Sequence, residues 1–299
     1  MSVNLPLWRS MLFVPANVDR FVNKAHERDA DAIILDLEDS VPLAEKAAAR
    51  LRIGSAAQLV ARAGADVIVR INSSLRLAAA DLETAVDARV AAICIPKVSS
   101  AEQLQWISEA IDQLEIEKQL PLGHTRLIAL VESVAALPKL IEIASSTSRL
   151  AGLIVGSEDF SASAGMEPTA DGLLYPNQQV VFAARGAGIA PLGFIGSIAE
   201  YSDKEAFRQT IRRSRQLGLV GGFCIHPDQV KIMNEEFSPS QADVENAMGI
   251  VAVFEQAIEQ GFGAAEYKGK MIDAPVVARA RELLALNEKI QSRGLCQRR

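Results

Sequence analysis

The stretch Ala32–Val41, AIILDLEDSV, places an apolar run directly before three acidic residues, Asp36, Glu38 and Asp39. A buried strand that ends in carboxylates is typical of the active-site floor in α/β enzymes, because parallel strands point their carboxyl ends at the substrate. Other apolar runs in this chain also end in polar residues. The sequence therefore predicts a parallel sheet with charged side chains gathered at one edge.

Apolar runs rich in Val, Ile and Leu, separated by segments of helical pattern, predict the strands of this sheet. The eight runs are Arg9–Pro15, Ala32–Asp39, Asp66–Asn72, Ala91–Val98, Arg126–Glu132, Gly152–Asp159, Pro191–Ser197 and Gly221–Pro227. Ser99 with Glu102, and Ser202 with Glu205, have the spacing of capping boxes that begin helices. Near-continuous apolar strands that alternate with helices indicate an α/β fold, and eight such units favour a closed (β/α)8 TIM-type barrel. No Gly-x-Gly-x-x-Gly follows the first run, which argues against a Rossmann domain.

Composition excludes several classes of protein. The chain has 299 residues, 49% of them hydrophobic, and a net charge of −6, which fits one large core and argues against nucleic acid or a membrane surface as partner. Its basic residues are scattered, apart from the C-terminal pair Arg298 and Arg299. Cys94, Cys224 and Cys296 form no Cys-x-x-Cys pair, so we expect neither a disulfide framework nor a zinc site, and a reducing cytoplasm is the expected setting. The N-terminus lacks an apolar run of signal-peptide length.

The segment after the eighth run is too long for a single closing helix. We therefore predict a barrel domain over residues 1–235 and a C-terminal extension over residues 236–299. The extension is expected to contain a helix over Gln241–Gln260, a hairpin about Lys268 and Gly269, and a last helix over Pro275–Ile290. A finished barrel cannot cover all the apolar side chains of this segment, so we expect it to dock on a neighbouring subunit.

Polar residues at the strand ends make up the candidate site. They are Asp36, Glu38, Asp39, Arg70, Lys97, Glu132, Glu158, Asp159 and His226. Glu132 and Asp159 end neighbouring strands, so a small oxygen-binding ion could take one carboxylate from each. Mg²⁺ fits best and Mn²⁺ is a second option, whereas the three histidines show no zinc-ligand spacing.

Each of these residues also has a purely structural interpretation. Asp39 or Ser40 could cap the following helix, and Arg70 could be an ion-pair partner of Asp36 or Glu38. Lys97 could lie on the rim of the barrel, and His226 could be a hydrogen-bonded rim residue. Asp273, before Ala274 and Pro275, has the pattern of a helix N-cap. The occurrence of a cation and several anions at one barrel mouth favours a catalytic site over these structural roles.

A series of sequence blocks carries a family resemblance. The blocks are RSMLFVPAN, AIILDLEDSV, VIVRIN, ICIPKV, LIALVES, AGLIVGSEDF, FCIHPDQV and KGKMIDAPVVARAR, in this order. Together they resemble the citrate lyase β-subunit-like branch of the HpcH/HpaI aldolase family, from Trp8 to Ile290. The late MIDAP block is typical of the members that act on coenzyme A or acyl-carrier thioesters.

The resemblance implies a role for each matching residue. Glu132 and Asp159 would hold Mg²⁺, and Asp36, Glu38 and Asp39 would surround them. Arg70 would bind substrate and stabilise a thioester enolate, and Pro15 and Glu132 would also contact substrate. Asp273 would be the general acid/base, acting at the barrel mouth of an adjacent subunit in a homotrimer or hexamer. No permanently bound organic cofactor is expected.

The implied reaction is the Mg²⁺-dependent cleavage of a 3-hydroxy-dicarboxylic acyl-CoA thioester, of the citramalyl-CoA or malyl-CoA type, to acetyl-CoA and a 2-oxo acid. The alternatives are a citrate lyase β subunit acting on a citryl-acyl-carrier protein, and a non-catalytic binding homologue. An aldolase for free 4-hydroxy-2-oxo acids is disfavoured by the MIDAP block.

Three segments depart from the family pattern. Ala16 replaces the usual Gly, the loop after Asn72 is short, and GFIGSIAEYSD lacks the acidic ending common after the seventh strand. These changes lie where the acyl group and its carrier would be selected.

Overall fold

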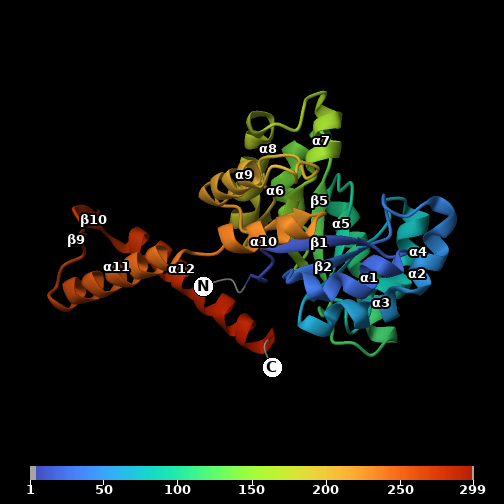
Figure 1. The fold of residues 1–299 in the computed structure, drawn as a ribbon, viewed down its shortest axis with the longest axis horizontal. Helices are drawn as coiled ribbons and strands as arrows, with labels where there is room; N and C mark the ends of the chain where they lie inside the picture. The colour runs from blue at the N-terminus through green and yellow to red at the C-terminus, as the bar shows by residue number, and fades with distance from the viewer. Residues whose placement is uncertain (1–4, 298–299) are drawn as a thin grey trace. The chain divides into compact units, whose positions relative to one another are not determined.

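The computed structural model describes residues 5–297, with side chains through residue 294 (Figure 1). The chain divides into two compact units, one formed by residues 3–237 and the other beginning at Ser238. The predicted basic pair Arg298 and Arg299 lies outside the described residues, as does the side chain of Cys296. Within residues 5–297, none of the helices is both long and apolar enough to span a membrane.

The first unit is built on eight strands in the order β7-β6-β5-β4-β3-β2-β1-β8, and all paired neighbours are parallel. The strands are β1 (Ser10–Pro15), β2 (Ala32–Asp36), β3 (Asp66–Arg70), β4 (Ala92–Ile95), β5 (Arg126–Val131), β6 (Leu150–Val155), β7 (Ala190–Leu192) and β8 (Gly222–Cys224). The backbone N–H of Val220 donates to Pro191 O at 3.0 Å, and that of Gly193 donates to Gly221 O at 2.7 Å. These bonds link the two outermost strands, so the predicted TIM-type barrel is confirmed.

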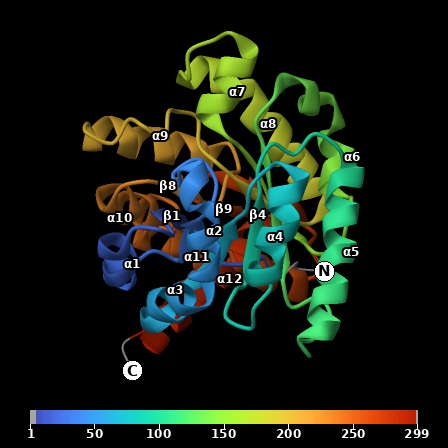
Figure 2. The same cartoon turned by 90° about the vertical axis from the view of Figure 1, so that its right-hand side faces the viewer.

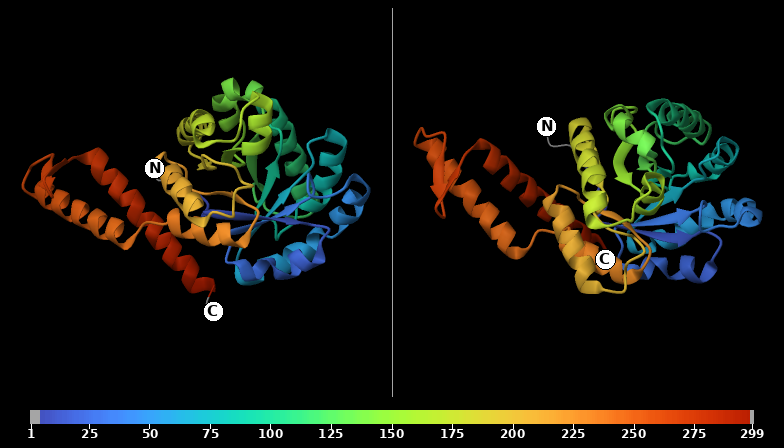
Figure 3. Two further views of the ribbon diagram at one scale, coloured as in Figure 1. Left: turned by 45° about the horizontal axis from the view of Figure 1, so that its top comes forward. Right: turned by 90° about the horizontal axis from the view of Figure 1, so that it is seen from above.

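Helices follow the strands and surround them (Figures 2 and 3). They are α1 (Asp19–Ala25), α2 (Lys46–Leu51), α3 (Ile53–Val60), α4 (Leu75–Ala85), α5 (Ala101–Glu117), α6 (Leu140–Ala144), α7 (Ser157–Ala164), α8 (Ala170–Ala187), α9 (Lys204–Gln216) and α10 (Pro227–Glu236).

Two predicted helix caps were wrong by one residue. Ser100, not Ser99, caps α5 by accepting from Gln103 N, and Asp203, not Ser202, caps α9 by accepting from Glu205 N and Ala206 N. Each helix begins one residue later than the Ser-x-x-Glu spacing suggests, because a capping oxygen must reach the second or third helical N–H.

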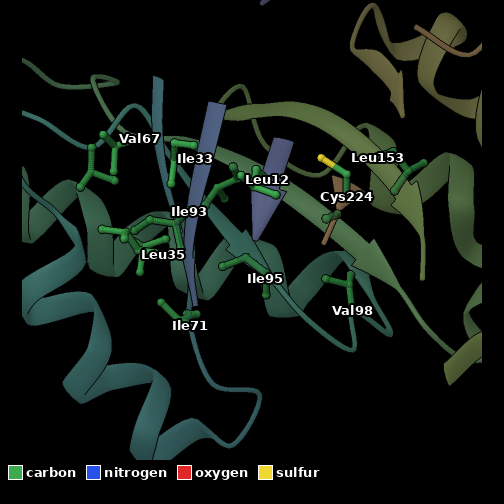
Figure 4. Packing of buried hydrophobic residues seen from close by; sticks show 14 of the residues in the cluster. Leu12, Ile33, Leu35, Val67, Ile71, Ile93, Ile95, Val98, Leu153 and Cys224 are labelled. Carbon is green, nitrogen blue, oxygen red and sulfur yellow. The ribbon is translucent and has the colours of Figure 1, made fainter. Parts of the chain in front are cut away.

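The strands are buried on both faces, which explains their near-continuous apolar sequences. One set of side chains, including Leu12, Ile33, Leu35 and Ile93, packs outward against the helices (Figure 4). Alternate residues such as Met11, Ile34 and Ile68 fill the barrel interior. Side chains at the carboxyl ends of the strands are therefore supported by a packed layer below them.

A buried ion-pair cluster lies near the amino ends of β5 and β6. Arg149 bonds Glu115 through Nη1 (2.9 Å) and Nη2 (2.6 Å), and Thr125 N and Gly123 N also donate to the Glu115 carboxylate. Burial raises the pKa of Glu115, but the bonds from Arg149, Thr125 and Gly123 outweigh burial and lower it to about 2. The cluster contributes to stability and not to catalysis, because barrel active sites lie at the opposite ends of the strands.

Replacing Glu115 with glutamine is expected to lower the free energy of unfolding by about 3 kcal/mol at pH 7, because Arg149 loses a buried charged partner. Since the folded-state pKa lies below the ordinary value of 4.5, the stabilisation is present above pH 4.5 and is lost as pH falls towards 2. Urea unfolding between pH 7 and pH 2 measures both effects. Glu117→Gln, an exposed neighbour on α5, is the matched control. Equal stabilities of the two variants would contradict the prediction.

The second unit contains α11 (Gln241–Glu259), β9 (Ala265–Tyr267), β10 (Lys270–Ile272) and α12 (Ala274–Gln297). Lys268 (φ 51°) and Gly269 (φ 75°) form the turn between the antiparallel strands, which confirms the predicted hairpin. Asp273 caps α12, because its Oδ1 accepts from Val276 N at 3.3 Å. The buried apolar cluster of this unit is small and centres on Phe254, Ile272 and Val277.

Candidate active site

A cavity of about 790 Å³ opens at the carboxyl ends of the barrel strands. The sequence-predicted residues that line it are Pro15, Asp36, Asp39, Arg70, Glu132, Glu158, Asp159 and His226. Glu38 lies beside them, at ion-pair distance from Arg70 and from Lys97. The structure thus brings together polar residues that end or follow β2, β3, β4, β5, β6 and β8, as expected for a barrel. Asp273 belongs to the other compact unit.

Arg70 is held in place by carboxylates from the adjacent strand. Asp36 and Arg70 are register partners on β2 and β3, and Arg70 Nε and Nη2 donate to the two Asp36 oxygens at 2.7 and 2.8 Å. Nη1 lies 3.1 Å from Glu38 Oε2, and the guanidinium carbon lies 4.6 Å from the ring centre of Phe13. Burial raises the pKa of Asp36, but bonding to Arg70 outweighs burial and lowers it. The ion-pair interpretation of Arg70 is confirmed, and the pair lies at the cavity wall.

Glu132 is positioned by two backbone features. Its Oε2 accepts from Lys97 N at 2.7 Å, where Lys97 adopts the left-handed conformation (φ 53°) that is uncommon for a residue other than glycine. A Cβ atom on Gly156 would lie 2.8 Å from Glu132 Cγ, so glycine there gives the carboxylate its space. Such local constraints cluster at functional sites.

The sequence placed Glu158 and Asp159 at the end of a strand, and this was wrong. The strand β6 ends at Val155, and both acids lie in the first turn of α7. Acidic side chains are favoured there by the helix dipole. Both acids are exposed and line the cavity, but the Glu158 carboxylate is already used in accepting a hydrogen bond from Ser197 Oγ at 2.6 Å. Asp159 is therefore the acid of this turn that is available to a cation.

The residues present fit a divalent cation. Burial and the nearby charges of Glu38 and Asp159 raise the pKa of Glu132 to about 8, against the lowering effect of the Lys97 N–H. Burial also raises the pKa of Glu38, and both of its oxygens are buried without a hydrogen-bond partner. Carboxylate oxygens with excess negative charge suit Mg²⁺.

No group of three or more His, Cys, Asp or Glu side chains within the described part of the chain has the arrangement of a metal cage. A cation at Glu132 and Asp159 would therefore take its other ligands from water and substrate, as Mg²⁺ commonly does.

Three cations on one helical face were missed by the sequence reasoning. Arg20, Lys24 and Arg28, spaced by four residues along α1 and the following turn, line the cavity. None of them forms an ion pair with a carboxylate among the residues that the structure describes. The signal was the Arg-x-x-x-Lys-x-x-x-Arg spacing directly after the first strand.

His226 is a rim residue, as its structural interpretation predicted. Its Nδ1 accepts from Asp228 N at 3.2 Å, so it caps α10, and its ring stacks on Tyr201 with the centroids 4.7 Å apart. The alternative cap before Val41 was wrong, because Ser40 Oγ donates to Asp36 and the next helical turn begins at Leu43.

A barrel with a fixed cation and a cluster of carboxylates at its mouth is typical of enzymes that act on anionic substrates. The family model for HpcH/HpaI aldolase/citrate lyase matches residues 9–227, and the chain belongs to this family. Citrate lyase subunit beta of Leuconostoc mesenteroides subsp. cremoris is 33% identical, with 97% of this chain and 98% of that protein covered. L-malyl-CoA/beta-methylmalyl-CoA lyase of Cereibacter sphaeroides is 34% identical, with 95% and 96% covered.

A solved structure adds ligands to this comparison. The protein CitE from Mycobacterium tuberculosis, in complex with magnesium, acetoacetate and coenzyme A, matches with a TM-score of 0.73 and 26% identity. The match covers 96% of this chain and 100% of that chain. The family resemblance is confirmed, and the protein is a lyase of the HpcH/HpaI family.

Proposed function

We propose that the protein cleaves a 3-hydroxyacyl thioester that carries a carboxylate on its hydroxyl carbon, giving an acetyl thioester and a 2-oxo acid. The bond between the hydroxyl carbon and the carbon next to the thioester breaks, and its electron pair forms the thioester enolate. The hydroxyl proton leaves to water, and another proton reaches the enolate carbon, so the atoms balance. The observation that carries the proposal is Arg70, fixed by Asp36, in one cavity with Glu132 and Asp159.

Glu132 and Asp159 would hold Mg²⁺, the ion bound in the structural relative CitE. When bound, the ion supplies Lewis-acid polarisation of the substrate hydroxyl and carboxylate oxygens. Lys97 N fixes Oε2 of Glu132, so Oε1 would be the oxygen available to the ion. Glu38, with both oxygens lacking hydrogen-bond partners, would accept from water molecules around the site.

Arg70 would hold the enolate oxygen. A guanidinium has five N–H groups, and the two hydrogen bonds to Asp36 together with the ion pair to Glu38 leave at least one of them for substrate. The carboxylates and the Phe13 ring fix its orientation before substrate arrives. A preorganised cation of this kind stabilises developing negative charge more effectively than water, which must reorient.

Asp273, from a neighbouring subunit of a homotrimer or hexamer, would transfer the proton to or from the enolate carbon. Only Oδ1 of Asp273 accepts the capping bond from Val276 N. Exposed apolar side chains on the same unit, among them Met248, Phe262 and Met271, support its docking on a partner.

The unpaired cations Arg20, Lys24 and Arg28 support coenzyme A as the carrier, because its phosphates need cationic contacts. The second candidate is a citrate lyase β subunit that acts on a citryl-acyl-carrier protein, which the citrate lyase subunit beta relative favours. Both candidates share the chemistry above and differ in the acyl group and the carrier.

The test is to incubate the protein with Mg²⁺ and citramalyl-CoA, malyl-CoA or citryl-CoA, and to follow release of the 2-oxo acid. Asp273→Asn is expected to lower kcat by roughly 10²- to 10⁴-fold, the usual contribution of a general acid or base. The cap should survive, since asparagine also caps helices well. Cleavage of none of these thioesters would contradict the CoA-dependent function. Full turnover by Asp273→Asn would contradict the role of Asp273 alone.

A further inference from the structure

The cavity has two chemically different sides. Asp36, Arg70 and Glu132 line the side formed by β2, β3 and β5. On the side formed by β6, β7 and β8, the lining is mainly apolar. It includes Ile154, Phe194, Ile198 and Phe223. The rings of Phe13 and Phe223 meet edge to face, with centroids 5.0 Å apart, and Phe13 also contacts Arg70. The apolar wall therefore begins directly beside the cation that would hold the enolate.

The loop after β7 presents no charged side chain to this wall. Gly193 has φ 125°, and a Cβ atom there would lie 2.7 Å from Asn177 Oδ1, so only glycine fits without strain. Gly196 also lines the cavity, and the Ser197 hydroxyl is used in its bond to Glu158. Ile198 follows, and its N–H donates to Ser157 Oγ at 3.4 Å, two residues from Asp159. Ile198 thus adds an apolar side chain to the cavity that Asp159 also lines.

The charges of the lining determine what this wall can accept. Among the described residues that line the cavity, the Arg and Lys side chains are Arg20, Lys24 and Arg28 on the α1 side, and Arg70. Arg70 is already shared by two buried carboxylates. His226 lies on the rim, stacked on Tyr201. The carboxylates that line the cavity after β6 are Glu158 and Asp159. A second substrate carboxylate pointing there would be desolvated without a cationic partner, which is strongly unfavourable.

We infer that the substituent on the hydroxyl carbon of the substrate is a methyl or short alkyl group, and not a carboxymethyl group. The 2-oxo acid released is then of the pyruvate or 2-oxobutanoate class, and the wall of Phe223, Ile154 and Ile198 discriminates against oxaloacetate. This inference rests on the proposed function and specifies its substrate class.

Binding of the oxo acids tests the inference without a carrier. Isothermal titration in Mg²⁺ should give pyruvate or 2-oxobutanoate a Kd at least about tenfold lower than that of oxaloacetate, the discrimination expected when one methylene-sized apolar contact is satisfied. Citramalyl-CoA should likewise exceed citryl-CoA in kcat/KM. Equal or tighter binding of oxaloacetate would overturn the inference. Cleavage of citryl-CoA in preference to citramalyl-CoA would also overturn it, while leaving the lyase function intact. Absence of all turnover would instead overturn the proposed function.

A pair of variants at Ile198 tests the wall itself. Ile198→Lys adds a cation beside Ser157 and Asp159, and Ile198→Met keeps similar length without charge. We expect the lysine variant to shift the Kd ratio of pyruvate to oxaloacetate towards oxaloacetate by about tenfold or more. The methionine variant should leave the ratio within about twofold of the parent. Equal ratios in both variants would overturn the inference, and thermal melting establishes that each is folded.

Discussion

Replacing Glu132 with glutamine is expected to abolish Mg²⁺-dependent turnover, with kcat lower by at least about 10³-fold, equivalent to about 4 kcal/mol of transition-state stabilisation. Glutamine has the same shape, and its carbonyl can still accept the bond from Lys97 N. The substitution removes the charge that a cation requires, so Mg²⁺ affinity falls with turnover. Mg²⁺ dependence of kcat and direct titration of Mn²⁺ by electron paramagnetic resonance measure the two effects.

Glu158→Gln is the matched control for this prediction. Glu158 lines the same cavity and carries the same charge, but its carboxylate is bonded to Ser197. We expect this variant to keep turnover within a few-fold of the parent. Above pH 8, where Glu132 is ionised, the metal-free Glu132→Gln protein should melt no lower than the metal-free parent, because the substitution then removes one buried charge from a crowded carboxylate cluster. Mg²⁺-dependent turnover by Glu132→Gln at the parental rate would contradict the assignment of the metal site.

The barrel was predictable because each strand is buried on both faces. Ile33 and Ile34 point to opposite layers of the barrel, and both layers are apolar. The strand sequences are therefore continuously apolar, without alternating polar residues, and this distinguishes them from the helices. The ends of the runs were less predictable. Acids after Val155 fit both a strand end and the first turn of a helix, and the helix dipole favours the second.

The charged cluster was predictable for the same reason, since parallel strands end at one mouth. The pairing within it was not. Whether Arg70 contacts Asp36, Glu38 or the substrate depends on side-chain rotamers and strand register, and register places Asp36 directly opposite Arg70. The α1 cations were missed because they lie beyond the strand ends. The catalytic role of Asp273 stays a prediction, because it depends on a second subunit.

Removing the Arg70 cation is expected to have two separable consequences. Arg70→Met leaves Asp36 buried, 0% exposed, without its charged partner, and should lower the free energy of unfolding by about 3–5 kcal/mol. It should also lower kcat/KM by about 10³-fold or more, because no fixed cation remains for the enolate. Arg70→Lys should keep part of the stability, but a single ammonium cannot bond both Asp36 oxygens and reach Glu38 together. Urea unfolding and steady-state kinetics measure the two quantities.

The double variant Asp36→Asn with Arg70→Met separates stability from catalysis. Replacing Asp36 with asparagine removes the buried negative charge that has lost its partner, so the double variant should be more stable than Arg70→Met alone. Its turnover should stay as low as that of the single variant, because asparagine restores no positive charge at the position of the guanidinium. If turnover returned together with stability, Arg70 would be a structural partner of Asp36 and not the group that holds the enolate. If stability recovered without turnover, the double variant would be folded and would differ from the parent at the site chiefly by the missing positive charge. That result would show that the Arg70 cation is needed for the chemical step.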